Sequence, residues 1–263
     1  MYAFTYERPT SEADALKLAQ AGARPLAGGQ TLLASMKPRL AAPEQIVDLG
    51  AVPELKGIRR EGDALVIGAM TRHCDVAESA EVRAAIPALA ALAGGIGDKQ
   101  VRARGTIGGS VANNDPAADY PAALLALGAT VHTTARAIAA ADFFQGLFAT
   151  ALEEGELITA VRFPIAAKAA YVKFAQPASL FALIGVFVAQ TAQGVRVAVT
   201  GGGSGVFRHQ AMEQALDARF APEAIAGVPT GEEQMSSDLH ASSAYRAHLV
   251  GVMAQRAVAQ ALA

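Results

Sequence analysis

The chain has 263 residues, of which 52% are hydrophobic and 17% charged, and its formal net charge is −2. This balance favours a well-packed soluble protein, argues against disorder and provides no basic stripe for nucleic acid. The N-terminus has no leader-like pattern and no apolar run reaches the length of a membrane span, so we expect a cytoplasmic protein.

A β-α-β unit is predicted at the start of the chain. Ser11 and Asp14 form a capping box that begins a helix, and Gly22 ends it. A strand, a short helix and a second strand follow at Pro25–Ala27, Gln30–Met36 and Ile46–Leu49.

The middle of the chain is predicted to mix short strands and helices. Leu55–Ile58 and Ala64–Ala69 indicate a hairpin because a charged turn separates them. The elements expected after it are helices at Thr71–Ser79, Glu81–Ala93 and Pro121–Leu127, a strand at Ala129–Thr133, and further elements at Asp142–Phe148 and Leu157–Phe163.

An antiparallel sheet with helices is predicted beyond Pro164. Its strands are Tyr171–Phe174, Ala182–Val188 and Val195–Thr200, and its helices are Gln210–Ala218 and Ser242–Leu262. The last helix is expected to turn Tyr245, Leu249, Val252 and Ala259 toward the core. Gly201–Gly205 lacks the lysine of a P-loop, which favours a strand-to-helix turn.

These elements predict an α+β fold with a boundary near Pro164–Ala167. The first domain is expected over residues 1–167, with subdomains of about 1–52 and 53–167. The second is expected over residues 168–263.

The cysteine and histidine content excludes several metal centres. Cys74 is the single cysteine, so the chain can form neither an intrachain disulfide nor an iron–sulfur cluster. The five histidines show no metal-ligand spacing. Cys74 has no evident orienting partner, which favours a structural thiol. Any metal chemistry must therefore come from another polypeptide.

Two segments carry a Gly-Gly pair after an apolar stretch, with a hydroxyl residue close by. They are Pro25–Leu33 and Gly105–Asn114. Glycine lets backbone N–H groups point into a shared concavity, and such nests bind phosphate oxygens. Two facing nests could hold a pyrophosphate from both sides. An ordinary tight turn is the alternative for each segment.

Taken with Asp115–Ala122, the two glycine segments resemble the FAD-binding medium subunit of molybdenum hydroxylases, the carbon monoxide dehydrogenase, xanthine dehydrogenase and aldehyde oxidoreductase group. The resemblance extends over almost the whole length. It includes Met36–Leu40, Ile46–Leu49, Tyr171–Phe174 and Asp238–Ser242, followed by Tyr245, Arg246 and Leu249.

The resemblance implies a set of FAD contacts. Two loops would hold the pyrophosphate, and the Asp119 carboxylate would accept hydrogen bonds from FAD hydroxyls. Lys173 would approach the pyrimidine edge of the flavin, and Phe181 would stack on its ring. The implied residues are Leu26, Ala27, Gly28, Gly29, Gln30, Thr31, Leu32, Leu33, Ile96, Thr106, Ile107, Gly108, Gly109, Ser110, Asp119, Ile158, Lys173 and Phe181.

Three of these residues have other interpretations from the sequence alone. Asp119 also fits a helix N-cap, Lys173 a solvated strand lysine, and Phe181 simple core packing. The chain also departs from many relatives, which have His-Ser at Gln30-Thr31 and often asparagine at Ser110. Both changes keep hydrogen-bonding capacity, so FAD binding is still expected.

The function implied by the resemblance is electron transfer by an oxidoreductase subunit with FAD as its cofactor and no catalytic acid or base. Its partners would be a molybdenum-cofactor subunit and an iron–sulfur subunit, in a dimer of heterotrimers. Two alternatives are a self-sufficient flavin-dependent oxidase or reductase of the same fold and a non-enzymatic nucleotide-binding assembly subunit.

Overall fold

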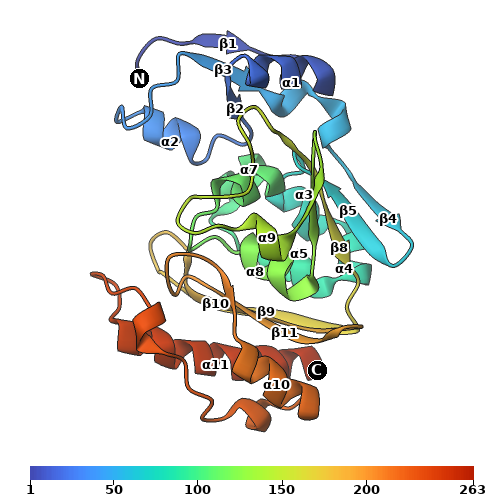
Figure 1. Ribbon diagram of the computed structural model, residues 1–263, viewed down its shortest axis with the longest axis vertical. Coiled ribbons are helices and arrows are strands. Elements are labelled where there is room, and N and C mark those ends of the chain that lie inside the picture. The colour runs from blue at the N-terminus through green and yellow to red at the C-terminus, as the bar shows by residue number, and fades with distance from the viewer.

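The computed structural model describes residues 1–263 and shows three stacked layers, each built on its own sheet (Figure 1). The fold is α+β, as predicted. No helix combines the length and apolar character needed to cross a membrane.

The N-terminal layer is a three-stranded parallel sheet with the strand order β1-β3-β2. Ser11 accepts a hydrogen bond from the Asp14 amide, which confirms the predicted helix start. The elements are β1 Thr5–Glu7, α1 Glu12–Gln20, β2 Arg24–Leu26, α2 Leu32–Met36 and β3 Gln45–Asp48.

The middle layer is a five-stranded antiparallel sheet with helices, in the strand order β4-β5-β8-β6-β7. Its strands are β4 Ile58–Glu61, β5 Ala64–Gly68, β6 Thr130–Thr133, β7 Ala137–Ala139 and β8 Ile158–Pro164. Its helices are α3 His73–Glu78, α4 Ala80–Ala85, α5 Pro87–Gly94, α6 Lys99–Arg104, α7 Ile107–Asn113, α8 Tyr120–Leu127 and α9 Ala140–Phe143.

Two predictions for this layer are wrong. Leu55 ends a 3₁₀ turn, and Gly57, with φ +106°, separates it from the true strand β4. The single helix expected over Glu81–Ala93 is two, because Pro87 forces Ile86 out of the helical region and starts α5 afresh.

The C-terminal layer is an antiparallel sheet in the order β12-β11-β10-β9, with helices against one face. Its elements are β9 Lys168–Ala175, β10 Ala182–Thr191, β11 Gly194–Thr200, β12 Phe207–Arg208, α10 Gln210–Ala218 and α11 Ser243–Leu262. The predicted core face of α11 is partly wrong. Tyr245 and Ala259 are exposed, whereas the buried stripe contains Arg246, Leu249, Val250, Met253, Ala254, Ala257 and Val258.

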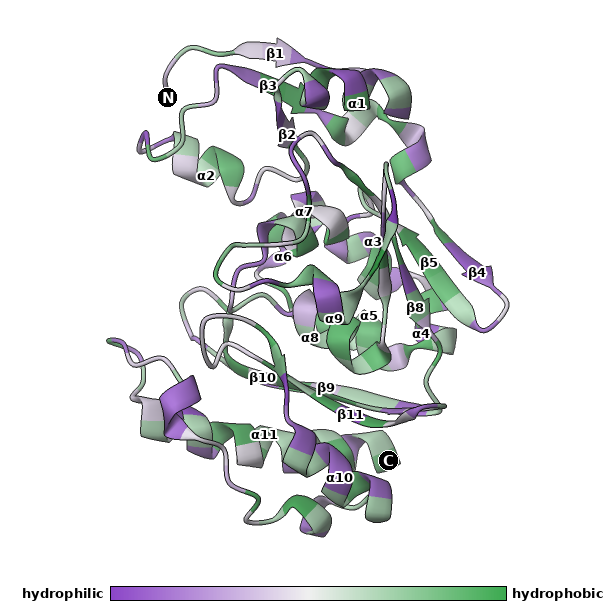
Figure 2. Cartoon of the chain, in the orientation of Figure 1, coloured by the Kyte–Doolittle hydropathy of each residue, from purple (hydrophilic) through white to green (hydrophobic).

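The middle layer and one face of the C-terminal sheet share one hydrophobic core. Phe187 and Ala189 of β10 belong to the hydrophobic cluster built on α5 and α8, while Val186 and Val188 face α11. All eight residues of α8 are buried. Figure 2 shows the apolar colouring of α8 and of the sheet beneath it. The boundary predicted near residue 167 therefore falls between strands of the middle and C-terminal sheets, but residues on both sides of it pack in the same hydrophobic cluster.

Candidate functional site

The first glycine segment leaves a row of backbone donors free. Strand β2 ends at Leu26, and the chain turns through Gly28 and Gly29, which has φ +73°, before α2 begins. The amides of residues 28–32 donate no hydrogen bond within the protein. This loop therefore has the open amides of an anion-binding nest.

The second glycine segment has a different local structure, because it forms the start of helix α7. The amides of Ile107, Gly108 and Gly109 donate to Thr71 O, Ala69 O and Thr106 Oγ1, at 3.1, 2.8 and 3.2 Å. The expectation of a second open nest does not hold here, since these amides already have partners. The groups that remain for a ligand are the Thr106 amide and the side chains of Thr106 and Ser110.

The two segments touch, as their pairing in the sequence suggested. A Cβ atom on Gly28 would lie 2.6 Å from Gly105 Cα, closer than real Cβ contacts allow. A Cβ on Gly109 would lie 3.1 Å from the Ala27 Cβ and 3.0 Å from Thr106 Oγ1. Glycine at residue 28 lets the N-terminal and middle layers meet backbone to backbone, and glycine at residue 109 leaves room for the Ala27 side chain.

A cleft of about 870 Å³ lies at this junction and collects most of the predicted site. Its lining includes Ala27, Gly28, Gly29, Gln30, Thr31, Leu32, Ile96, Thr106, Gly108, Gly109, Ser110, Asp119, Ile158 and Phe181. Four predicted residues are not part of the lining: Leu26, Leu33, Ile107 and Lys173.

Asp119 is the buried carboxylate of the cleft. It accepts hydrogen bonds from the Tyr171 hydroxyl and from the Lys173 ammonium, whose Nζ lies 3.0 Å from Oδ1. Burial raises the pKa of the Asp119 carboxyl, and these two partners oppose the rise. Asp119 occupies the N-cap position of α8, but its side chain caps no amide there. The carboxylate therefore serves the Tyr171 and Lys173 contacts rather than the helix start.

Lys173 and Phe181 differ from their simplest sequence interpretations. The Lys173 side chain is 12% exposed, so it is not a solvated strand lysine. Phe181 is 47% exposed and lines the cleft, which excludes simple core packing. Whether either side chain touches a flavin stays a prediction.

His73 is a cleft residue that the sequence argument missed. It is 4% exposed, and its Nδ1 has no hydrogen-bond partner. A Cβ on Gly105 would lie 2.5 Å from its Nε2, so glycine at residue 105 makes room for the ring. Burial, together with the Arg102 charge, lowers the pKa of His73 to about 4, which keeps the imidazole neutral at physiological pH. His73 and Gly105 are far apart along the chain, so no local pattern in the sequence could have identified this contact.

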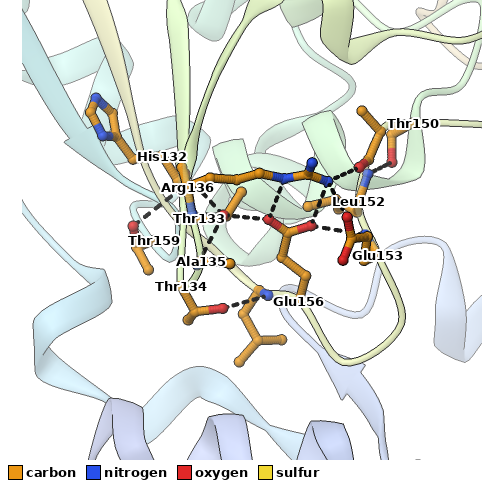
Figure 3. A network of polar contacts seen from close by, with 12 residues as sticks. His132, Thr133, Thr134, Ala135, Arg136, Thr150, Leu152, Glu153, Glu156 and Thr159 are labelled. Atoms are coloured by element: carbon orange, nitrogen blue, oxygen red, sulfur yellow. Dashed lines mark hydrogen bonds and ion pairs between the residues drawn. The ribbon is translucent and has the colours of Figure 1, made fainter.

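One wall of the cleft is the loop before β8, and a charged network fixes it (Figure 3). The Glu156 side chain, 4% exposed, accepts hydrogen bonds from Thr133 Oγ1, from the Glu153 amide at 2.8 Å and from Arg136. Arg136 also donates to Ala151 O at 2.8 Å. Ionised Glu156 thereby joins the hairpin β6–β7 to the loop that leads into Ile158.

Metal and thiol chemistry have no visible site in this chain. No group of three or more His, Cys, Asp or Glu side chains is arranged to hold a metal ion. Cys74 is half-buried, and burial raises the pKa of its thiol. A thiol with a raised pKa is a poor nucleophile at neutral pH.

Comparison with known proteins identifies the class. Residues 2–166 match the family described as the FAD binding domain in molybdopterin dehydrogenase. The chain is 38% identical to the carbon monoxide dehydrogenase medium chain of Afipia carboxidovorans, over 99% of this chain and 97% of that one. It is 33% identical to the glyceraldehyde dehydrogenase medium chain of Sulfolobus acidocaldarius, over 97% and 96%.

A solved structure gives the same result. Carbon monoxide dehydrogenase from Hydrogenophaga pseudoflava, in a form that lacks the Mo-pyranopterin moiety of its cofactor, superposes with a TM-score of 0.91. The sequences are 36% identical, and the match covers 99% of this chain and 98% of that one. The chain belongs to the FAD-binding family of molybdopterin dehydrogenases, and it is an oxidoreductase flavoprotein subunit.

The residues of the cleft fit FAD. The unpaired amides of residues 28–32 are suited to phosphate oxygens, and the nearby hydroxyls of Thr31, Thr106 and Ser110 can donate to them. The buried Asp119 carboxylate is suited to accept from sugar-like hydroxyls. The cleft volume lies within the range of cofactor sites.

Proposed function

We propose that this chain is the electron-transfer subunit of a heteromeric molybdenum hydroxylase, receiving electrons from iron–sulfur clusters and delivering them to an external acceptor. Bound FAD supplies the redox chemistry. The observation that carries the proposal is the row of five free amides at residues 28–32, set against a second glycine segment in one cleft. Membership of the family supports the same conclusion.

The protein's part is to bind and orient the cofactor. In this proposal residues 28–32 hold the pyrophosphate, with Thr106 and Ser110 completing the cradle from the facing segment. Asp119 accepts from FAD hydroxyls, and Ile96, Ile158 and Phe181 border the flavin ring. The Lys173 ammonium, which lies outside the cleft lining, holds the Asp119 carboxylate.

The partners we propose are a molybdenum-cofactor subunit and an iron–sulfur subunit, assembled as a dimer of heterotrimers. The relatives named as medium chains support a multi-subunit enzyme. In such an enzyme the molybdenum subunit oxidises the substrate, and this chain requires no acid or base of its own.

Spectroscopy and elemental analysis of the purified chain test this division of labour. Expressed alone, the chain should contain flavin but negligible molybdenum and iron. Under anaerobic conditions the flavin absorbance should persist when carbon monoxide, an aldehyde or an N-heterocycle is added. It should bleach only when the substrate of the complex is added with both partner subunits present. Rapid bleaching of the isolated chain by an organic substrate would instead favour a self-sufficient flavoenzyme.

A further inference from the structure

The Lys173 ammonium joins three separate segments of the chain. Its Nζ donates to Gly95 O at 2.8 Å, to Leu180 O at 2.8 Å and to Asp119 Oδ2 at 3.2 Å. An ammonium has three hydrogens, and these three oxygens account for all of them. The side chain is also 12% exposed and lies outside the cleft lining.

Each of these oxygens belongs to the cleft wall or to the residue next to it. Gly95 follows helix α5 and precedes Ile96, and Leu180 precedes Phe181. Ile96, Asp119 and Phe181 all line the cleft. One side chain on β9 thus fixes the local position of three cleft residues that come from different layers of the fold.

The Leu180 contact has a further consequence for the loop Gln176–Phe181 that joins β9 to β10. Leu180 has φ +60°, a left-handed conformation that costs a non-glycine residue energy. Gln176 Oε1 accepts from the Ala178 and Ser179 amides, at 2.6 and 2.7 Å, and holds the first part of the loop. The second part is closed by backbone bonds from the Leu180 amide to Gln176 O and from the Gln176 amide to Phe181 O, both at 2.9 Å. The Lys173 ammonium adds a contact to the strained Leu180, next to the Phe181 side chain that lines the cleft.

We propose that Lys173 is a positioning residue that sets Ile96, Asp119 and Phe181 in their binding geometry before FAD arrives, rather than a flavin contact. The inference rests on the proposed function, because it assumes that this cleft takes FAD. When the cleft residues are already ordered, less conformational entropy is lost as the cofactor binds. The role of Lys173 should therefore appear in the affinity for FAD and in the order of the loop Gln176–Phe181.

The first test measures loop order and needs no variant. Hydrogen exchange at the Leu180 and Phe181 amides is compared in the full chain with and without FAD. A preformed loop should be protected in both states, with FAD slowing exchange no more than about threefold. A loop that is unprotected without FAD and becomes protected on binding would overturn the proposal.

The second test removes the ammonium. Lys173→Met should speed exchange at Ile96, Leu180 and Phe181 in the FAD-free chain and raise the FAD dissociation constant at least about tenfold. Lys168→Met is the matched control, because Lys168 is an exposed lysine at the start of the same strand. It should leave both readouts unchanged. A lowered flavin reduction potential with unchanged affinity and unchanged exchange would identify a direct charge contact and overturn the proposal.

A double-variant comparison separates positioning from independent effects. If Lys173 acts partly through Phe181, the loss of affinity in Lys173→Met/Phe181→Ala should be smaller than the product of the single losses by at least about fivefold. Losses that multiply fully would contradict a role through Phe181.

The FAD content of the wild-type chain separates this inference from the proposed function. A wild-type chain that takes up no FAD would rule out the proposed function itself. A wild-type chain that binds FAD while Lys173→Met binds it equally well would remove only this inference.

Discussion

At the scale of single residues, the site depends on glycines whose missing side chains let two layers touch. Gly28 and Gly105 lie backbone to backbone, and His73 occupies the space that a side chain at residue 105 would fill. Gly109 packs between Thr106 and Ala27. A larger residue at position 28 would push the two layers apart, whereas one at position 105 would displace the His73 ring.

Gly109→Val tests this directly. The new side chain would meet Thr106 Oγ1 and Ala27 at about 3 Å and would project into the proposed cradle. Flavin content per chain should fall sharply while the far-ultraviolet circular dichroism stays near that of the wild type. Gly251→Val is the matched control, since a Cβ atom on Gly251 in α11 would meet no atom within 4 Å. Full flavin occupancy in Gly109→Val would show that this segment does not hold the cofactor.

His73 predicts an acid-sensitive stability. Its pKa is about 4 in the folded chain and near 6.5 when unfolded, so the unfolded state binds the proton more readily. Above pH 6.5 the protonation of His73 therefore costs the folded state nothing. As the pH falls toward 4, the free energy of unfolding drops by up to about 3 kcal/mol. Urea unfolding between pH 7.5 and 4 measures it. His73→Phe should flatten this part of the profile, whereas a profile unchanged from wild type would contradict the assignment.

At the scale of elements, the cleft is bounded by loops that specific side chains hold in place. Lys173 holds the β9–β10 loop, and Glu156 with Arg136 holds the loop before β8. The two loops approach the cleft from different layers. Lys173 anchors its loop from strand β9, whereas Arg136 and Glu156 join two loops to each other.

Glu156→Gln should loosen the second loop. The variant keeps the shape of the side chain but loses the charge that pairs with Arg136, and we expect a loss of about 1–3 kcal/mol in unfolding free energy. Burial raises the pKa of Glu156, but the Glu153 amide, Thr133 and Arg136 outweigh it and lower the pKa overall. The wild-type advantage should therefore be present above the unfolded carboxyl pKa and vanish as the pH falls through the lower, folded value. Equal stability of the two proteins at pH 7 would contradict this.

At the scale of the whole molecule, the C-terminal sheet completes the core of the middle layer. Phe187 is fully buried, lies 6.1 Å from the Tyr171 ring and belongs to the same cluster as α8. Tyr171 in turn donates to Asp119, so the shared core reaches the cleft. The two layers should therefore unfold together rather than as independent domains.

Phe187→Ala measures this coupling. Removing a fully buried phenylalanine should cost about 3–5 kcal/mol, and it should weaken both layers because both pack on it. Thermal unfolding followed by tyrosine absorbance and by circular dichroism should remain one coincident transition at a lower temperature. Phe174→Ala, at a 39% exposed position on β9, should cost less. Two separate transitions, with only the later one shifted, would contradict a shared core.

Much of the fold could be predicted from the sequence because local signals specify elements. The capping Ser11 predicts the start of α1, the apolar run Ala182–Val188 predicts the strand β10, and Gln210–Ala218 is the helix that the pattern predicted. The errors occur where local signals compete. Pro87 divides a continuous apolar pattern into two helices. Helix α11 is oriented with Arg246 buried, because its guanidinium donates to Leu183 O and Gly201 O.

The sequence by itself determined the α+β class, the family and the pairing of the two glycine segments, because these depend on residue types in order along the chain. The tertiary structure decided which groups of each segment are available. Residues 28–32 keep their amides free, whereas Thr71 and Ala69, which precede the second segment by more than thirty positions, already bind its amides. The tertiary structure likewise brings the Lys173 ammonium into contact with Gly95, Leu180 and Asp119. Hydrogen-bond partners so distant in sequence are chosen by packing, which no local pattern encodes.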